Sequence, residues 1–428
     1  MKNIKITKNP FLLFLPFLIL YLVLILIFAI NETHHDDQSR YITYAQNLIN
    51  GFYSPPFPDI DLGNGPGYPL ILVPFVALNL PLICIQLLNA LFYYLSIVIL
   101  FKALQQIVSF RFTIILSLFW ACYYTFYEQM TFALPEVFAS SLIPLLIFNI
   151  LKVFKQDNPK NTKKYIFFSG CTFGYLALTK PIFGYVLIFM LVGMGFLLIA
   201  NRKTINYKKS IAIILIALVT TAPYLFYTYN LTGKILYWSS FGGNNLYWMS
   251  TPYKDEYGSW HPYTINPNKK ESVPGSENLI KLRHQKDFDE ISKYKGEEQD
   301  GALKKIAIRN IKSHPIKFLQ NCFSNAGRML FNFPSSFETQ KPSTLLRLPV
   351  NGIMLVLIAF CLIPTLINWR KILFSIRFML FIAFLYFCGS LLGSAESRMF
   401  VMIVPILLIW IAFVIPKSIK INLKDWKD

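Results

Sequence analysis

Long apolar blocks alternate with short charged segments along this chain of 428 residues. Each block has about the length of a helix that crosses the hydrocarbon core of a bilayer. The ten blocks lie near residues 11–30, 82–101, 112–128, 132–151, 165–179, 182–200, 210–229, 348–368, 375–393 and 399–415. The pattern predicts an all-α polytopic membrane protein with about ten transmembrane helices, in a range of nine to thirteen. The first block lacks a small-residue cleavage site and is expected to remain as a helix.

The polar stretches divide the chain into three predicted domains. Residues 1–230 form an N-terminal transmembrane module, and its first outer loop, residues 31–81, is too polar and too rich in Pro and Gly to be a simple span. Residues 231–346 form a long extracytoplasmic segment. Residues 347–428 hold the closing transmembrane helices and a basic cytoplasmic tail.

Helical periodicity continues inside the outer segments. Four polar or aromatic residues of the first loop share one helix face at spacings i, i+3, i+4 and i+7, namely Asp37, Arg40, Tyr41 and Tyr44. With Leu48 and Ile49 on the apolar side, this stretch predicts an interfacial helix that ends at Asn50-Gly51. "LGNGPGYPLILVPF" then predicts a tight turn and a re-entrant or interfacial helix. In the long outer segment, "ALKKIAIRNIKSHPIKFLQNCFSNAGRMLF" predicts one or two amphipathic helices broken at Pro315.

Charge changes the picture by fixing the expected orientation. The net charge is +19, although only 15% of the residues are charged. Lys and Arg concentrate in the segments that are cytoplasmic if the N-terminus is, whereas the short outer connections hold only Arg40, Lys180 and Arg398. The basic excess therefore indicates topology and no nucleic acid partner. We expect a multi-pass protein integral to the plasma (inner) membrane, with both termini cytoplasmic and its active site on the extracytoplasmic face.

Ionisable residues gather at the outer ends of helices that are far apart in sequence. Asp36 and Asp37 follow the first block; the others are Glu136, Lys180, Glu396 and Arg398. Charged groups at the edge of a membrane are costly and indicate function by default. A carboxylate can act as a general base on an acceptor, and cations can hold a phosphate as it leaves. The set predicts transfer from a phosphate-linked lipid donor.

Other interpretations of these residues stay open. The adjacent aspartates would also suit a helix start, and Lys180 and Arg398 would suit lipid headgroups. Glu136 would suit a structural pair with a neighbouring helix. The aromatic stretch that contains Tyr247 and Trp248 would serve either as an interfacial belt or as a sugar-stacking surface. His34 and His35 are candidate metal ligands beside the aspartates, although contiguous residues make a poor metal cage.

Four motifs in consistent order resemble the membrane GT-C glycosyltransferases, in the bacterial branch related to protein O-mannosyltransferases and the lipid A aminoarabinose transferase. They are "DDQSRYITYAQNLINGFYS…NGPGYPLILVPF", "ALTKPIFGY", "APYLFYTYNLTGKILYWSSFGGNNLYWMSTPY" and "AESRMFVMIVP". The first is similar to the family's Asp-Glu-x-x-Tyr loop, and the last to its Glu-x-Arg-Tyr-x-x-Pro motif. Departures are Gln38, where the family often has Glu, Lys180 in place of Arg, and Tyr224 and Tyr227 in place of Trp and Arg.

The resemblance implies a transferase, inverting at the anomeric carbon, that uses a polyprenyl-phosphate sugar. It matches Asp37 to the catalytic aspartate and leaves Asp36 as an extra carboxylate that raises the basicity of its neighbour. Lys180 and Arg398 would hold the donor phosphate. The supporting or substrate-binding candidates are Arg40, Tyr41, Glu136, Glu396, Tyr247 and Trp248. The sequence requires no cofactor and leaves a divalent metal open, because Gln38 puts the second acid in doubt.

Two other functional classes remain as alternatives. A lipid-linked glycan flippase or transporter would need internal repeats and ionisable groups near the bilayer midplane, and neither is evident in the sequence. An O-antigen ligase or polymerase would also use a long outer loop, but it would not predict the aspartates of the first loop. The expected partners are thus a polyprenyl-phosphate-linked sugar donor, membrane lipids, and a glycan, lipid or protein acceptor.

Overall fold

The computed structural model describes residues 9–29, 36–155, 158–200, 205–261, 273–340 and 342–418. Over these residues the chain consists of helices and connecting loops, without strands. The predicted all-α polytopic architecture is confirmed.

Eight helical segments in the described part of the chain are long and apolar enough to cross a membrane. They are α1 (Pro10–Phe28), α4 (Leu82–Leu104), α7 (Pro135–Lys155), α9 (Ile182–Ala200), α10 (Ile205–Thr232), α15 (Ser343–Ile367), α16 (Phe374–Leu392) and the continuous run of α17 (Ser397–Phe400), η2 (Val401–Ile403) and α18 (Val404–Ser418). Two predicted spans fall outside this set. The block at 112–128 is divided between α5 (Phe110–Ala121) and α6 (Tyr124–Gln129), and the block at 165–179 belongs to α8 (Pro159–Thr179), whose first turns carry lysines.

Burial separates central helices from helices that face the lipid. Every residue from Val404 to Val414 in α18 is buried, so α18 lies at the centre of the bundle. In α1, by contrast, most side chains are exposed although they are apolar, as Leu26 and Ile27 show. Lipid tails are as apolar as these side chains, so a helix that is apolar on all sides can face the lipid as well as the protein core.

The first outer loop contains the two helices that its periodicity predicts. α2 (Asp36–Ile49) is the amphipathic helix, and its chain turns away at Gly51, which has a φ of +87°. α3 (Gly67–Ala77) is a short apolar helix that packs beside α2. The loop therefore folds as a helical hairpin against the membrane helices.

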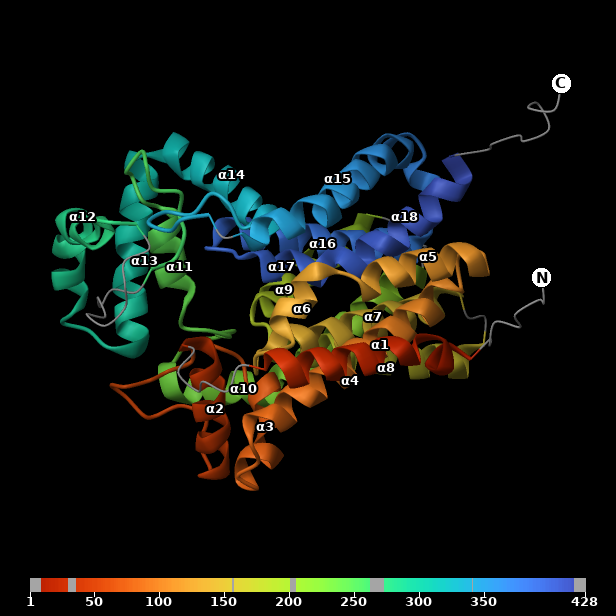
Figure 1. The fold of residues 1–428 in the computed structure, drawn as a ribbon, viewed down its shortest axis with the longest axis horizontal. Helices are drawn as coiled ribbons and strands as arrows, with labels where there is room; N and C mark the ends of the chain where they lie inside the picture. The colour runs from red at the N-terminus through yellow and green to blue at the C-terminus, as the bar shows by residue number, and fades with distance from the viewer. Residues whose placement is uncertain are drawn as a thin grey trace.

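The long outer segment forms a helical unit of its own at one end of the molecule (Figure 1). It comprises α11 (Gly242–Met249), α12 (Ser276–Ile291), α13 (Gly296–Ser313) and α14 (Pro315–Phe331). The predicted break at Pro315 is confirmed, because α13 ends at Ser313 and α14 begins at the proline. A short 3-10 helix, η1 (Trp369–Lys371), joins α15 to α16. The Pro10 end of α1 and the Ser418 end of α18 lie at the opposite end from α12 and α13 (Figure 1).

Candidate active site

Four charged side chains from four separate helices meet where α2 packs against the membrane bundle. Asp37 lies in the first turn of α2, Glu136 in the first turn of α7, Lys180 at the C-cap of α8 and Arg398 in α17. The sequence predicts this set from helix ends alone, and the structure brings all four together. Each residue comes from a helix end, so the bundle's geometry places their charges in one layer.

Arg398 is the centre of this charged cluster. Its Nη2 donates a hydrogen bond of 2.6 Å to Asp37 Oδ2. Its Nε lies 3.5 Å from Glu136 Oε1 and 2.9 Å from Glu396 Oε2. One guanidinium thus contacts three carboxylates, which its planar fork of donors allows.

Lys180 completes the cluster on the side of Glu136. Its Nζ donates to Glu136 Oε1 at 2.5 Å. The Glu136 side chain is only 2% exposed, and its second oxygen, Oε2, is buried without a hydrogen-bond partner among the described residues. Glu136 is therefore one half of an interhelical ion pair, and its second oxygen is an acceptor without a protein partner among the described residues.

Asp37 is an ionised carboxylate in this setting. Burial raises the pKa of Asp37, but the charge and hydrogen bond of Arg398, with smaller contributions from Arg40 and Lys180, outweigh burial, so the pKa lies below its usual value of 3.8. The side chain remains 27% exposed. Asp37 can therefore accept a proton from a bound molecule, although its pairing with Arg398 makes it a weak base while that pair is intact.

This lowered pKa predicts how stability depends on pH. A carboxylate with a depressed folded-state pKa contributes stability that is complete above its unfolded pKa and is lost as pH falls through its folded pKa. We expect the difference in melting temperature between the wild type and Asp37→Asn to stay constant from about pH 8 to about pH 5, and to shrink only below 3.8. Thermal unfolding in detergent would measure it. A difference that already disappears between neutral pH and pH 6 would contradict the assignment.

Arg40 and Tyr41 support the cluster through a residue that the sequence analysis did not select. Asn64 accepts from Arg40 Nη1 at 3.2 Å and donates to the Tyr41 hydroxyl at 2.7 Å. Arg40 Nη1 also lies 3.6 Å from Asp37 Oδ1, and its guanidinium carbon lies 4.6 Å from the ring centroid of Phe241. Burial, followed by the charges of nearby carboxylates, raises the pKa of Tyr41 well above its usual value, so its hydroxyl stays neutral. In the sequence, only their place in the glycine-containing stretches "NGPG" and "FGG" could have indicated Asn64 and Phe241.

Gln38 explains one departure from the family pattern. Its side chain is fully buried, and its Oε1 accepts a 2.8 Å hydrogen bond from the backbone N–H of Ala133. That contact ties α2 to the loop that leads into Glu136. The second carboxylate of the cluster is Glu136, which belongs to α7. The Gln38 amide fixes the position of α2 relative to the start of α7.

A close backbone approach explains the glycines of the "NGPG" turn. A Cβ atom placed on Gly65 would lie 2.0 Å from the carbonyl oxygen of Leu178. One on Gly67 would lie 2.5 Å from the Thr179 hydroxyl. Only glycine lets the first loop approach the end of α8 this closely, and Lys180 follows immediately.

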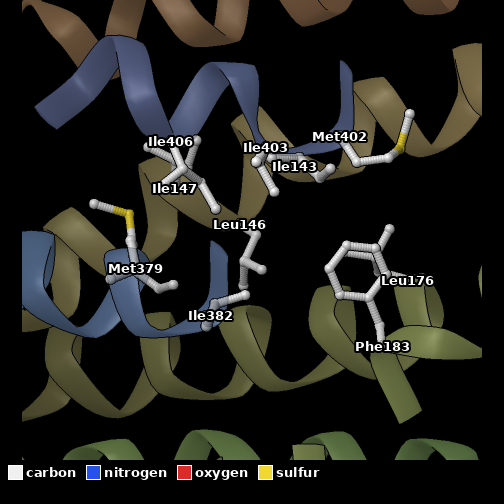
Figure 2. A pocket seen from close by; sticks show the side chains of 11 residues that line it. Ile143, Leu146, Ile147, Leu176, Phe183, Met379, Ile382, Met402, Ile403 and Ile406 are labelled. Carbon is white, nitrogen blue, oxygen red and sulfur yellow. The ribbon is translucent and has the colours of Figure 1, made fainter. Parts of the chain in front are cut away.

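An apolar cavity lies among α7, α8, α9, α16, η2 and α18, and Figure 2 shows the side chains that line it. Its lining includes Ile143, Phe183 and Met402, which follow Glu136, Lys180 and Arg398 by one or two helical turns. No polar side chain lines it, and it is so narrow that it would hold about one water molecule. The helices that carry Glu136, Lys180 and Arg398 therefore continue from the charged cluster into an apolar interior.

Tyr247 and Trp248 lie in a hydrophobic core separate from the charged cluster, and their contact with a substrate stays a prediction. Both are 1% exposed and belong to the core that α11 forms with α12 and α13. The Tyr247 hydroxyl lies 2.7 Å from His284 Nδ1 and donates to Asp287 Oδ2 at 3.0 Å. The structure thus gives this pair a packing role. Their aromatic density resembled a sugar platform because a small apolar core and a stacking surface use the same residues.

Three predicted residues cannot be placed. His34 and His35 lie outside the described residues, as does the side chain of Asp36. Within the described part of the chain, no group of three His, Cys, Asp or Glu side chains is arranged to hold a metal ion. The hypothesis of a divalent metal at this site stays a prediction.

Comparison with known proteins gives one family match. Residues 64–227 match the family of dolichyl-phosphate-mannose-protein mannosyltransferases. This region contains Glu136 and Lys180 and ends before Arg398. Among curated protein sequences, none matches this chain.

Solved structures show the fold. The chain is similar to the oligosaccharyltransferase of Archaeoglobus fulgidus in its apo form, at 12% identity and a TM-score of 0.52, covering 93% of this chain and 50% of that one. ArnT from Cupriavidus metallidurans bound to undecaprenyl phosphate has 12% identity, coverage of 95% and 78%, and a TM-score of 0.43. The S. cerevisiae protein O-mannosyltransferase Pmt1–Pmt2 complex, bound to the sugar donor, has 16% identity and a TM-score of 0.40, covering 53% of this chain. The chain spans only 34% of that protein's length. The chain thus has the GT-C type fold that its motifs predict.

Proposed function

We propose that this chain, which shares the fold of the GT-C type membrane glycosyltransferases, transfers a sugar from a polyprenyl-phosphate-linked donor to an extracytoplasmic acceptor. The observation that carries the proposal is the cluster of Asp37, Glu136, Lys180 and Arg398 at the junction of the first loop and the membrane helices. The matched family supports it, since its name specifies a lipid-phosphate-linked sugar as donor.

The two cations are the proposed binding groups for the donor phosphate. Lys180 and Arg398 are each 17% exposed, so neither cation is fully enclosed by the protein and both are proposed to contact the donor. Phosphate oxygens form strong charge-assisted hydrogen bonds with both kinds of cation. A phosphate at Arg398 would compete with Asp37 for the guanidinium, because one fork cannot serve all its partners at full strength.

That competition would activate the base. With Arg398 engaged by phosphate, Asp37 loses its strongest stabilising partner and its pKa rises toward the ordinary value. Asp37 then accepts the proton of an acceptor hydroxyl as that oxygen attacks the anomeric carbon. The bond from the anomeric carbon to the phosphate oxygen breaks on the opposite face, and its electron pair leaves with the lipid phosphate. The configuration at the anomeric carbon is inverted. Lys180 and Arg398 stabilise the negative charge that develops on the leaving lipid phosphate.

Glu136 has a different proposed part. It holds Lys180 and one edge of Arg398 at fixed positions in the buried wall of the site. Its unpartnered Oε2 offers an acceptor for a sugar hydroxyl beside the phosphate. Asp37 and Glu136 thus divide the work between proton transfer and orientation.

Loss of a sugar from the cell envelope tests the proposal. Mass spectrometry of envelope glycolipids, glycans and glycoproteins should find one modification missing in a deletion strain. The wild-type gene should restore it, and an Asp37→Asn gene expressed at the same level should not. An envelope whose glycans are unchanged by the deletion would overturn the proposed function. In the purified system, undecaprenyl-phosphate mannose offered with the envelope fraction of the deletion strain is the first donor to test.

A further inference from the structure

The polar face of α14 is directed into the protein, while its apolar face is exposed. Ile316, Leu319 and Phe323 form an exposed stripe, and Phe323 is 79% exposed. On the opposite face, Asn321 and Asn325 are fully buried, and Arg328 is nearly so. Buried polar side chains on an outward-facing apolar helix need partners inside the protein, and Asn325 has an unusual number of them.

Asn325 binds the backbone of the loop that precedes Arg398. Its side-chain nitrogen lies within hydrogen-bond distance of the carbonyl oxygens of Ser390, Leu391 and Gly393. Its side-chain oxygen accepts from the Ala395 N–H at 2.9 Å. One side chain thus contacts the last turn of α16 and the segment between α16 and α17.

This turn sets the position of Arg398. Glu396 is the N-cap of α17, and Arg398 is the second residue of that single helical turn. α17 continues through η2 into the buried helix α18, which fixes its C-terminal side. On its C-terminal side, the Tyr386 hydroxyl donates to the Met399 carbonyl at 3.2 Å. On its N-terminal side, the anchor is Asn325.

The same face of α14 is tied to the outer unit. Arg328 donates to Asn325 Oδ1 at 2.8 Å and to the Tyr257 carbonyl at 2.6 Å. One turn before Asn325, Asn321 donates to the carbonyls of Met249 and Thr251, at 3.0 and 3.2 Å. The row of polar side chains therefore links residues 249–257 to the turn at 390–395.

We propose that Asn325 is the positioning residue for Arg398, because it holds the turn that precedes α17. The proposal rests on the proposed function for the role of Arg398, but not for the anchoring of the turn. Asn325 touches no substrate. It acts by holding the backbone that presents the guanidinium to Asp37 and to the phosphate.

Asn325→Ala is the direct test, with Asn321→Ala as its matched control. Both substitutions remove a buried asparagine from the same face of α14, but only the first frees the turn. In lipid nanodiscs, amide hydrogen exchange of a peptide covering residues 390–400 should rise about tenfold in Asn325→Ala and stay unchanged in Asn321→Ala. Unchanged exchange in Asn325→Ala, or an equal rise in both variants, would overturn the proposal.

Donor kinetics provide the functional readout. We expect Asn325→Ala to raise KM for undecaprenyl-phosphate mannose, or for the donor found in the envelope experiment, about tenfold, with a smaller change in kcat. Asn321→Ala should change it less than about threefold. In an Arg398→Ala background, Asn325→Ala should add no further loss, because the residue acts through Arg398. Additive losses would show that Asn325 acts by another route.

Asn325→Asp is a second variant that tests the proposal if Asn325→Ala does not fold. Asn325→Asp keeps the volume and the acceptor for Ala395 and Arg328. It replaces the donors toward the carbonyls at 390–393 by a carboxylate oxygen that repels them. It should reproduce the rise in exchange and in donor KM. If exchange rises as expected and no polyprenyl-phosphate sugar is ever consumed, the anchoring stands and the proposed function fails. If sugar transfer is found but exchange does not change, the proposed function stands and the anchoring role of Asn325 fails.

Discussion

Replacing Asp37 by Asn is expected to reduce sugar transfer by about 10²–10⁴-fold, the range associated with loss of a general base. The substitution keeps the size of the side chain and one acceptor oxygen, so α2 should still pack against the bundle. It removes the only carboxylate of the cluster that combines a direct bond to Arg398 with a position on the open first loop. The measurement is transfer per folded molecule in nanodiscs, with donor binding followed separately.

The matched control for Asp37→Asn is Asp59→Asn. Asp59 lies in the same loop, is exposed and pairs only with Lys295 at 3.0 Å among the contacts of the described residues. Exposed pairs of this kind contribute at most about 1 kcal/mol, so transfer should be unaffected. If Asp37→Asn inserts normally and retains full activity, Asp37 is not the base. The buried Glu136 would then be the next carboxylate to test.

Much of the site could be predicted because charge and topology constrain each other in a membrane protein. Helices that cross a bilayer have their ends in two layers, and an ionisable residue at an end belongs to one of them. Once the orientation was chosen, Glu136, Lys180 and Arg398 had to fall in the same layer as Asp37. The structure brings them into contact. Their chemical roles remain predictions that only the substitutions can test.

The contacts that hold the cluster in place could not be predicted in the same way. Asn64, Gln38 and Asn325 act through hydrogen bonds to distant backbone or side-chain atoms. Such contacts have no periodicity and no fixed spacing in sequence, because the partner depends on how separate elements pack. Asn325 accepts a hydrogen bond from the N–H of Ala395, which is 70 residues away in the sequence. An asparagine on an amphipathic helix would ordinarily be assigned to solvent.

Two features of the fold show where local patterns mislead. The apolar block at 112–128 predicts one span, but the chain breaks at Cys122 and Tyr123, where the Tyr123 side chain turns inward to Asn351. Hydropathy averages over such a break. Likewise, the aromatic residues at 247 and 248 gave the composition of a binding surface and form a core. Aromatic composition shows that side chains are kept away from water, and a hydrophobic core and a sugar-binding surface both exclude water.

Arg398→Gln should cause the second large loss of transfer, about 10²–10³-fold, because a group that stabilises developing charge on the leaving phosphate is removed. The substitution also leaves Asp37, Glu136 and Glu396 around a position without a cation, so the site repels the anionic donor. KM for the donor should therefore rise together with the fall in kcat. Loss of Arg398 also removes the main interaction that lowers the pKa of Asp37, so the acid limb of the activity profile should move to higher pH.

Arg398→Lys and Lys180→Arg form the paired test of that role. Lysine keeps the charge at position 398, but a single ammonium cannot span the three carboxylates that the guanidinium contacts, so most of the loss should remain. At position 180, Glu136 is the cation's ion-pair partner among the described residues, and the family that the motif resembles commonly has arginine there. Lys180→Arg should thus retain activity to within about threefold. If Arg398→Lys retained activity as well as Lys180→Arg does, the cluster would need only a given net charge, and a role for Arg398 in planar recognition of phosphate would be excluded.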